Sequence, residues 1–108
     1  MEKVQNYCIV YCNTDTLANA ELISKAIISE KLAACVSIIP NIISIYEWED
    51  KIEQRNEFNL TIKTSLEKME KLEIRITELH SDKVPEIICV GINSISKPYL
   101  EWMKINLQ

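Results

Sequence analysis

The stretch LAACVSIIPNIISIYEW (residues 32–48) is followed by a turn at residues 49–51 and by IEQRNEFNLTIKT (residues 52–64). Branched apolar side chains dominate both segments and favour strands, so we predict that they pair as one long hairpin. Pro40 and Asn41 interrupt the first segment, and a proline there predicts a bulge or an edge position. Each segment is more than twice the usual strand length of about 5–6 residues. A chain of 108 residues has too little body to cover such arms, so we expect them to project and to pair with something.

Regular elements flank the hairpin on both sides. Residues 4–12 predict a strand that is largely apolar on both faces. Asn13, Thr14 and Asp15 then supply capping side chains for a helix that is predicted to run to Lys31.

The second half repeats this pattern. Thr64 and Glu67 have the spacing of a capping box, which predicts the start of a second helix. Its apolar stripe contains Leu66, Met69, Leu72, Ile76 and Leu79. Residues 86–92 predict a fourth strand, and Pro98 is well placed in the first turn of a C-terminal helix.

The element order is therefore βαββαβ with a terminal helix. This order predicts a single α+β domain over residues 1–108 with ferredoxin-like topology. Right-handed crossovers place both helices on one face of the sheet. The strands are apolar on the other face as well, so a second copy of the chain is the expected cover and the pattern predicts an oligomer.

Charge and hydropathy exclude two classes of partner. The net charge is −4, whereas proteins that bind nucleic acid need a positive field around the phosphates. No apolar stretch is long enough to span a bilayer, so we expect no membrane partner. The N-terminus has no cleavage site typical of a signal peptide, which favours the cytoplasm, where Cys8, Cys12, Cys35 and Cys89 stay reduced.

No strong catalytic motif is present. His80 follows the second helix, where a polar C-cap is the simpler interpretation. A sharper interpretation makes His80 a metal ligand or proton carrier near Glu86.

The cysteines give a weak signal for metal binding. Cys8 and Cys12 share a strand face but lie about 13 Å apart, so they cannot bind one ion together, whereas Cys89 on the neighbouring strand can pair with one of them. Buried structural thiols are the simpler interpretation. At the hairpin tip, carboxylates either protect an exposed edge or bind hard cations. Tyr46 and Trp48 share one face there and are candidate anchors for a partner subunit or a ligand.

Several segments, in order along nearly the whole chain, resemble one family. Residues 30–38 contain LAACV, followed by Ser44, Tyr46 and Trp48 at the spacing S-x-Y-x-W. Glu57 and the pair Lys63 and Thr64 match a spaced E…KT, Leu79 to Ile87 resembles LHPYxVPEI, and the C-terminal helix carries YL-x-W. The chain is identified on these residues as a member of the CutA family.

This resemblance implies a ferredoxin-like homotrimer linked to tolerance of divalent cations, especially copper, with no required cofactor and no enzymatic activity. It implies Cys35 and His80 as metal contacts, to which we add Glu86, and a cleft between subunits. Its expected cleft or interface residues are Tyr46, Trp48, Glu57, Lys63 and Trp102. The chain departs from the family pattern where Ser81 and Asp82 replace Pro-Tyr and where Asp50 replaces a hairpin Gly.

Three other functions remain open at this stage. A PII-type signalling trimer shares the fold, but this chain lacks the glycine-rich basic loop that phosphates need. A thiol enzyme would use Cys35 with His80 as base, and requires the two side chains within hydrogen-bond reach. A scaffold for protein partners is the third.

Overall fold

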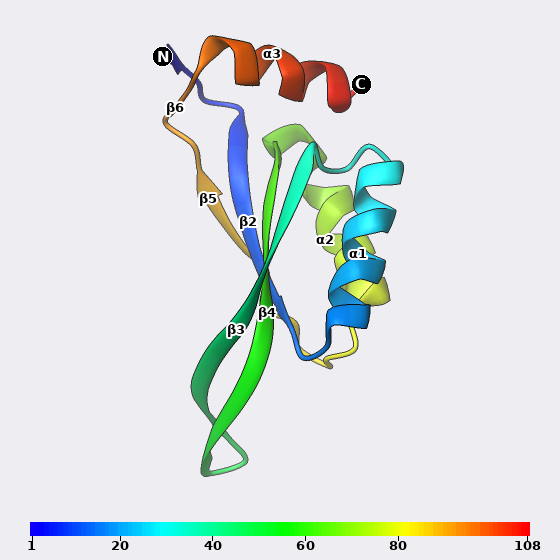
Figure 1. The fold of residues 1–108 in the computed structure, drawn as a ribbon, viewed down its shortest axis with the longest axis vertical. Coiled ribbons are helices and arrows are strands. Elements are labelled where there is room, and N and C mark those ends of the chain that lie inside the picture. The colour runs from blue at the N-terminus through cyan, green and yellow to red at the C-terminus, as the bar shows by residue number, and fades with distance from the viewer.

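A computed structural model describes residues 1–108 and confirms the ferredoxin-like topology (Figure 1). The strands are β1 (Glu2–Lys3), β2 (Tyr7–Thr14), β3 (Cys35–Trp48), β4 (Lys51–Ser65), β5 (Ile88–Gly91) and β6 (Ser94–Ile95). The helices are α1 (Leu17–Ser29), α2 (Met69–Leu79) and α3 (Lys97–Asn106), with a 3₁₀ turn at Leu66–Lys68 before α2. The main sheet has the antiparallel order β3-β4-β2-β5. No helix is long and apolar enough to cross a membrane.

The core lies between this sheet and the helix layer formed by α1 and α2 (Figure 1). Alternate residues of β2 are buried, including Cys8, Val10 and Cys12, which are 0% exposed. They pack with Ile23 and Ile27 of α1 and with the buried residues of α2. Each fully buried large aliphatic side chain contributes roughly 1.5–3 kcal/mol. Cys8 and Cys12 are thus core residues, as the simpler interpretation held.

Helix α1 is capped differently from the prediction at both ends. Thr16, and none of the three predicted residues, accepts the Asn19 N–H at 3.1 Å. The helix ends at Ser29 because Lys31 has φ 62°. The Leu32 N–H then donates to the Ile27 carbonyl at 2.9 Å, which closes the last turn in a Schellman arrangement.

The predicted capping box before α2 is wrong. The Thr64 hydroxyl is buried and donates to the Leu32 carbonyl at 2.7 Å, so it satisfies a neighbouring strand end and leaves the helix uncapped. Leu66 lies in the 3₁₀ turn and is 45% exposed, so it does not belong to the buried stripe of Leu72 and Ile76. The fourth predicted strand is also shorter than residues 86–92, because only Ile88–Gly91 pairs with β2.

Strands β3 and β4 extend past the rest of the sheet as a two-stranded arm (Figure 1). The register shifts between Ile39 and Ile42, which confirms the bulge predicted at Pro40. The chain reverses at Glu49 and Asp50, both with positive φ (51° and 65°), as in a type I′ turn. The arm makes the molecule elongated, with extents of 45 × 25 × 23 Å.

A second, smaller cluster closes the opposite end of the sheet. Helix α3 lies there beside the two-stranded sheet of β1 and β6 (Figure 1). The buried residues of this cluster are Ala34, Ile95, Leu100, Met103 and Leu107.

The sheet face away from α1 and α2, called here the open face, is covered by the chain only at its α3 end, where Tyr7 packs against the α3 cluster. Tyr7, Ile9 and Tyr11 of β2 point to this face, because they alternate with the buried residues. Its β5 positions, Ile88 and Val90, are 51% and 47% exposed. The open face therefore carries apolar side chains without internal cover.

Candidate functional site

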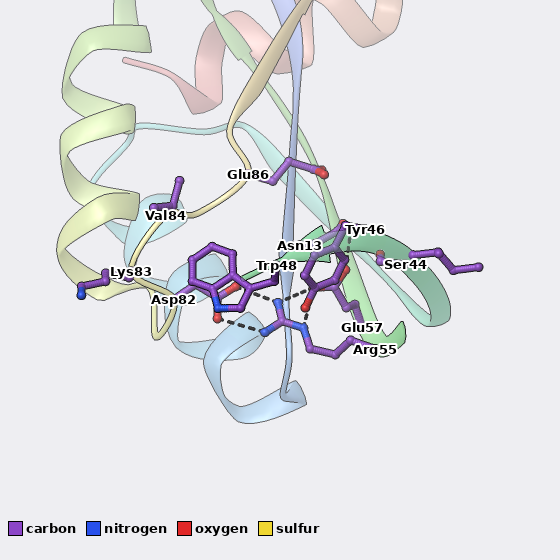
Figure 2. A pocket seen from close by; sticks show the side chains of 11 residues that line it. Asn13, Ser44, Tyr46, Trp48, Arg55, Glu57, Asp82, Lys83, Val84 and Glu86 are labelled. Atoms are coloured by element: carbon purple, nitrogen blue, oxygen red, sulfur yellow. Dashed lines mark hydrogen bonds and ion pairs between the residues drawn. The ribbon is translucent and has the colours of Figure 1, made fainter. Parts of the chain in front are cut away.

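A cavity of about 580 Å³, called here the arm cleft, opens where the arm leaves the sheet (Figure 2). One wall comes from β3 and β4, and the other from the connection between α2 and β5. The lining residues are Asn13, Ser44, Ile45, Tyr46, Trp48, Arg55, Glu57, Asp82, Lys83, Val84 and Glu86.

Arg55 joins the two walls of the cleft through its guanidinium group (Figure 2). Its Nη1 and Nη2 donate to the two carboxylate oxygens of Asp82 at 3.2 and 2.7 Å. Its Nε donates to Glu57 at 3.1 Å, and its Nη2 also bonds the same Glu57 oxygen. Two parallel bonds to one carboxylate fix the guanidinium orientation. The Arg55 bridge therefore holds the connection after α2 against the arm.

The carboxylates of the cleft differ in the direction in which their pKa values are shifted. The hydrogen bonds from Arg55 lower the pKa of Asp82, against the effect of its partial burial. The same bonds raise the pKa of Arg55. Glu86 has no such partner. Its side chain remains exposed to solvent, but partial desolvation, followed by the negative charge of Glu57, raises its pKa. Glu86 is thus the carboxylate that would gain most from a nearby cation.

A chain of polar side chains continues the network across the open face. Asn13 donates to Glu57 at 3.3 Å and accepts from Asn59 at 2.7 Å. Asn59 in turn accepts from the Thr61 hydroxyl at 2.8 Å. These groups satisfy one another within the chain, so another copy could cover this strip without leaving them unpaired.

His80 is the C-cap residue of α2, and both of its ring nitrogens are engaged. Nε2 donates to the Asn13 carbonyl at 2.7 Å, and Nδ1 accepts the Asp82 N–H at 2.9 Å. The neutral Nε2–H tautomer is the one that makes both bonds. To bind a metal through Nδ1, His80 would first have to release the Asp82 backbone.

The structure separates Cys35 from His80 within one chain. Cys35 lies opposite Lys63, beside Tyr99, whose pKa is raised by burial and by Cys35. Lys63 in turn pairs with Ile9 of β2, so Cys35 lies level with Ile9. His80 is bonded to Asn13, which is four residues, or about 13 Å, further along β2. The nucleophile–base pair required for a thiol enzyme is therefore not formed within one chain.

The predicted cleft residues divide into two groups. Tyr46, Trp48 and Glu57 line the arm cleft together with Glu86. Trp102 stacks on Tyr99 at the α3 end, with ring centroids 5.3 Å apart, and Lys63 lies on β4 toward that end.

Sequence reasoning missed Arg55 and gave Asp82 only as a departure from a pattern. Arg55 and Glu57 are two residues apart on one strand, so their shared face was available as a signal. The contact with Asp82 spans 27 residues, and no local spacing indicates it.

Comparison with known proteins identifies the family. A family model described as CutA1 divalent ion tolerance protein matches residues 8–106. The chain belongs to the CutA family. It is 39% identical over 87 residues to the divalent-cation tolerance protein CutA of Thermus thermophilus, covering 81% of this chain and 84% of that relative. It is 40% identical over 96 residues to the chloroplastic CutA protein of Arabidopsis thaliana, covering 89% of this chain but only 53% of that relative. The chain therefore spans about half the length of the Arabidopsis protein.

Solved CutA structures have the same fold. CutA1 from Oryza sativa superposes with a TM-score of 0.93 at 34% identity and covers 99% of this chain and 98% of that one. CutA from Synechococcus elongatus gives 0.95 at 26% identity, covering 99% and 95%. The CutA assignment therefore rests on sequence and on architecture together.

Proposed function

We propose that this CutA-family chain is a non-enzymatic homotrimer in divalent-cation tolerance, and that it binds a cation, with copper the leading candidate, at arm clefts completed by neighbouring subunits. The observation that carries this proposal is the position of the cleft. It opens on the sheet face away from α1 and α2, at the root of an arm that projects from the domain.

The open face supports the assembly step of the proposal. Exposed apolar patches of this kind mark association surfaces in soluble proteins. Ile88 and Val90 on β5 are 51% and 47% exposed, and Tyr46 and Trp48 on the arm are 37% and 49% exposed. Aromatic side chains are enriched at interface cores. The polar strip through Asn13 and Asn59 is already hydrogen-bonded, so covering it costs little.

The charge distribution supports a cation as ligand. Glu57, Asp82 and Glu86 place three carboxylates in the cleft against the cations Arg55 and Lys83. Arg55 is committed to Glu57 and Asp82. Glu86 remains without a cationic partner, and desolvation first and the charge of Glu57 second raise its pKa. A bound cation would remove the repulsion between Glu86 and Glu57.

The other two predicted metal contacts, Cys35 and His80, enter this proposal only through the assembly. Within one chain they lie in different places, so one ion could join them only if subunits bring them together. Glu86 is therefore the first residue to test.

Cation titration of the reduced, metal-free protein tests the proposal. Equilibrium dialysis with Cu(II), Zn(II) and Mg(II) should show saturable binding that Glu86→Gln weakens at least tenfold. Glu73→Gln, a carboxylate lost from the exposed surface of α2, is the matched control and should bind as the wild type does. Equal affinity of the Glu86→Gln variant and the wild type would refute the cleft as the cation site.

A second candidate is a small organic ligand held between Tyr46 and Trp48. The cavity volume lies in the usual range for such sites, about 300–1,000 Å³. ATP in the same titration tests the PII-like version of this function, and stoichiometric ATP binding would favour it over a cation. A scaffold role for protein partners would leave both titrations flat.

The proposed location is the cytoplasm, where the four free cysteines would stay reduced. Relatives carry other labels: the Arabidopsis protein is named chloroplastic, and a structure from Archaeoglobus fulgidus is named periplasmic. The cysteine chemistry is thus the support for this location.

A further inference from the structure

Two cysteines outside the arm cleft, Cys8 and Cys89, lie next to each other on neighbouring strands. In the β2–β5 register, Cys89 is opposite Val10 and Cys8 is opposite Gly91. The two cysteines are therefore diagonal neighbours on the same sheet face. Burial first, and the neighbouring Cys89 thiol second, raise the pKa of Cys8 to about 12.

The pair is open on one side. Cys8 is fully buried, whereas Cys89 is exposed on the edge strand β5. Gly91, directly opposite Cys8, has no side chain, and nothing lies within 4 Å of the position where one would begin. The space beside Gly91 is therefore open, and Cys89 is the member of the pair that solvent reaches.

The spacing favours an ion between the sulfurs over a bond joining them. A disulfide needs sulfurs about 2.05 Å apart and Cα atoms usually 4.4–6.8 Å apart, whereas diagonal neighbours in a sheet are about 7–8 Å apart. An ion held by two thiolates at about 2.3 Å each separates the sulfurs by about 4.6 Å. Diagonal neighbours on one sheet face fit that wider spacing better than they fit a disulfide.

The number of ligands selects the ion. Cys12 is about 13 Å along β2 from Cys8, so the site offers two soft ligands and no third cysteine. Zinc is almost always held by four ligands in closed protein sites, whereas Cu(I) accepts two thiolates and prefers soft donors.

We propose that Cys8 and Cys89 form a two-thiolate binding site for Cu(I). Binding converts two thiols and one Cu(I) into a bis-thiolate complex and releases two protons, with no change in oxidation state. The affinity therefore rises with pH, by up to about 100-fold per pH unit while both thiols are protonated. The site is separate from the arm cleft and does not require the trimer.

Competition with a chromogenic Cu(I) chelator under anaerobic, reducing conditions tests this site in the full chain. Wild type should take up one equivalent of Cu(I) per chain. Cys89→Ser is the decisive variant because it changes an exposed position and keeps the core, and it should weaken Cu(I) binding at least 100-fold. Cys8→Ala should do the same, with circular dichroism to check its fold. Glu73→Gln, on the exposed surface of α2, is the control and should leave this affinity unchanged.

Two results would overturn the proposal. One is wild-type Cu(I) affinity in Cys89→Ser, and the other is Zn(II) binding as tight as Cu(I) at the same pair. The Glu86→Gln variant separates this proposal from the cleft: it should keep the Cys89-dependent Cu(I) binding in full. If that variant keeps Cu(I) and cleft binding is absent from the wild type, the cleft hypothesis fails and the thiol site stands.

Discussion

Removing the Arg55 guanidinium should destabilise the fold through the charge it leaves behind. Arg55→Met keeps an unbranched side chain of comparable length but deletes the hydrogen bonds to Glu57 and Asp82. The Glu57 side chain is 6% exposed, so its carboxylate would be left buried with only the Asn13 amide as partner. Asp82 is 24% exposed and would recover part of its solvation from water.

The burial of each partner sets the expected magnitude. Breaking a fully buried ion pair costs about 3–5 kcal/mol. Because the Arg55 side chain is 33% exposed, water screens part of the interaction, and we expect a loss of about 2 kcal/mol in the free energy of unfolding. Replacing Glu57 by Gln as well removes the stranded charge, so Arg55→Met/Glu57→Gln should regain about 1 kcal/mol.

Urea unfolding followed by far-UV circular dichroism measures these differences at one fixed protein concentration, because assembly makes stability depend on concentration. Arg75→Met is the matched control: Arg75 bonds Glu30 at 2.9 Å, but Glu30 is 39% exposed, so the loss should be clearly smaller than for Arg55→Met. Equal losses for Arg55→Met and Arg75→Met, or no recovery in the double variant, would refute the stranded-charge reasoning.

The remaining predictions concern pH and backbone conformation. Because its pKa is lowered in the fold, Asp82 contributes stability that is present above its ordinary pKa of 3.8 and lost as the pH falls through the lowered value. Asp82→Asn should therefore flatten the stability curve below about pH 4 in acid titrations. Glu86 affects stability in the opposite direction: its pKa is raised above 4.5, so stability is lost as the pH rises through the raised value. Glu86→Gln should therefore be more stable than wild type at pH 7. Lower stability of the variant at that pH would contradict this assignment. Lys31 has φ 62°, so Lys31→Gly should raise the free energy of unfolding by up to about 1 kcal/mol in urea unfolding, whereas Lys25→Gly inside α1 should lower it by a similar amount. Asp50→Gly should stabilise the type I′ turn by less than about 1 kcal/mol, and a loss of stability would contradict the strain assigned to it.

Periodicity predicted those parts of the fold in which side-chain alternation and burial coincide. The alternation of β2 and the length of the arm both appear in the structure, as does the bulge at Pro40. Each follows from a rule that acts over a few residues. The prediction of the α2 start was wrong because a distant group competes for the capping side chain. Thr64 has the spacing of a cap, but its hydroxyl donates to the Leu32 carbonyl.

The candidate site was predictable only in part for the same reason. Tyr46, Trp48 and Glu57 belong to one hairpin, so their shared surface follows from strand pairing. The bond from Arg55 to Asp82 depends on where the connection after α2 returns to the sheet. That position is set by packing of the whole domain, and no spacing along the chain reveals it.

The open face gives the most direct test of the account as a whole. Multi-angle light scattering at micromolar concentration measures the mass of the reduced chain in solution. We expect three times the chain mass of 12.5 kDa, because two further copies would cover the apolar face and complete the arm clefts. A particle of one chain mass would contradict it, since the open face and the arm would then stand uncovered in water.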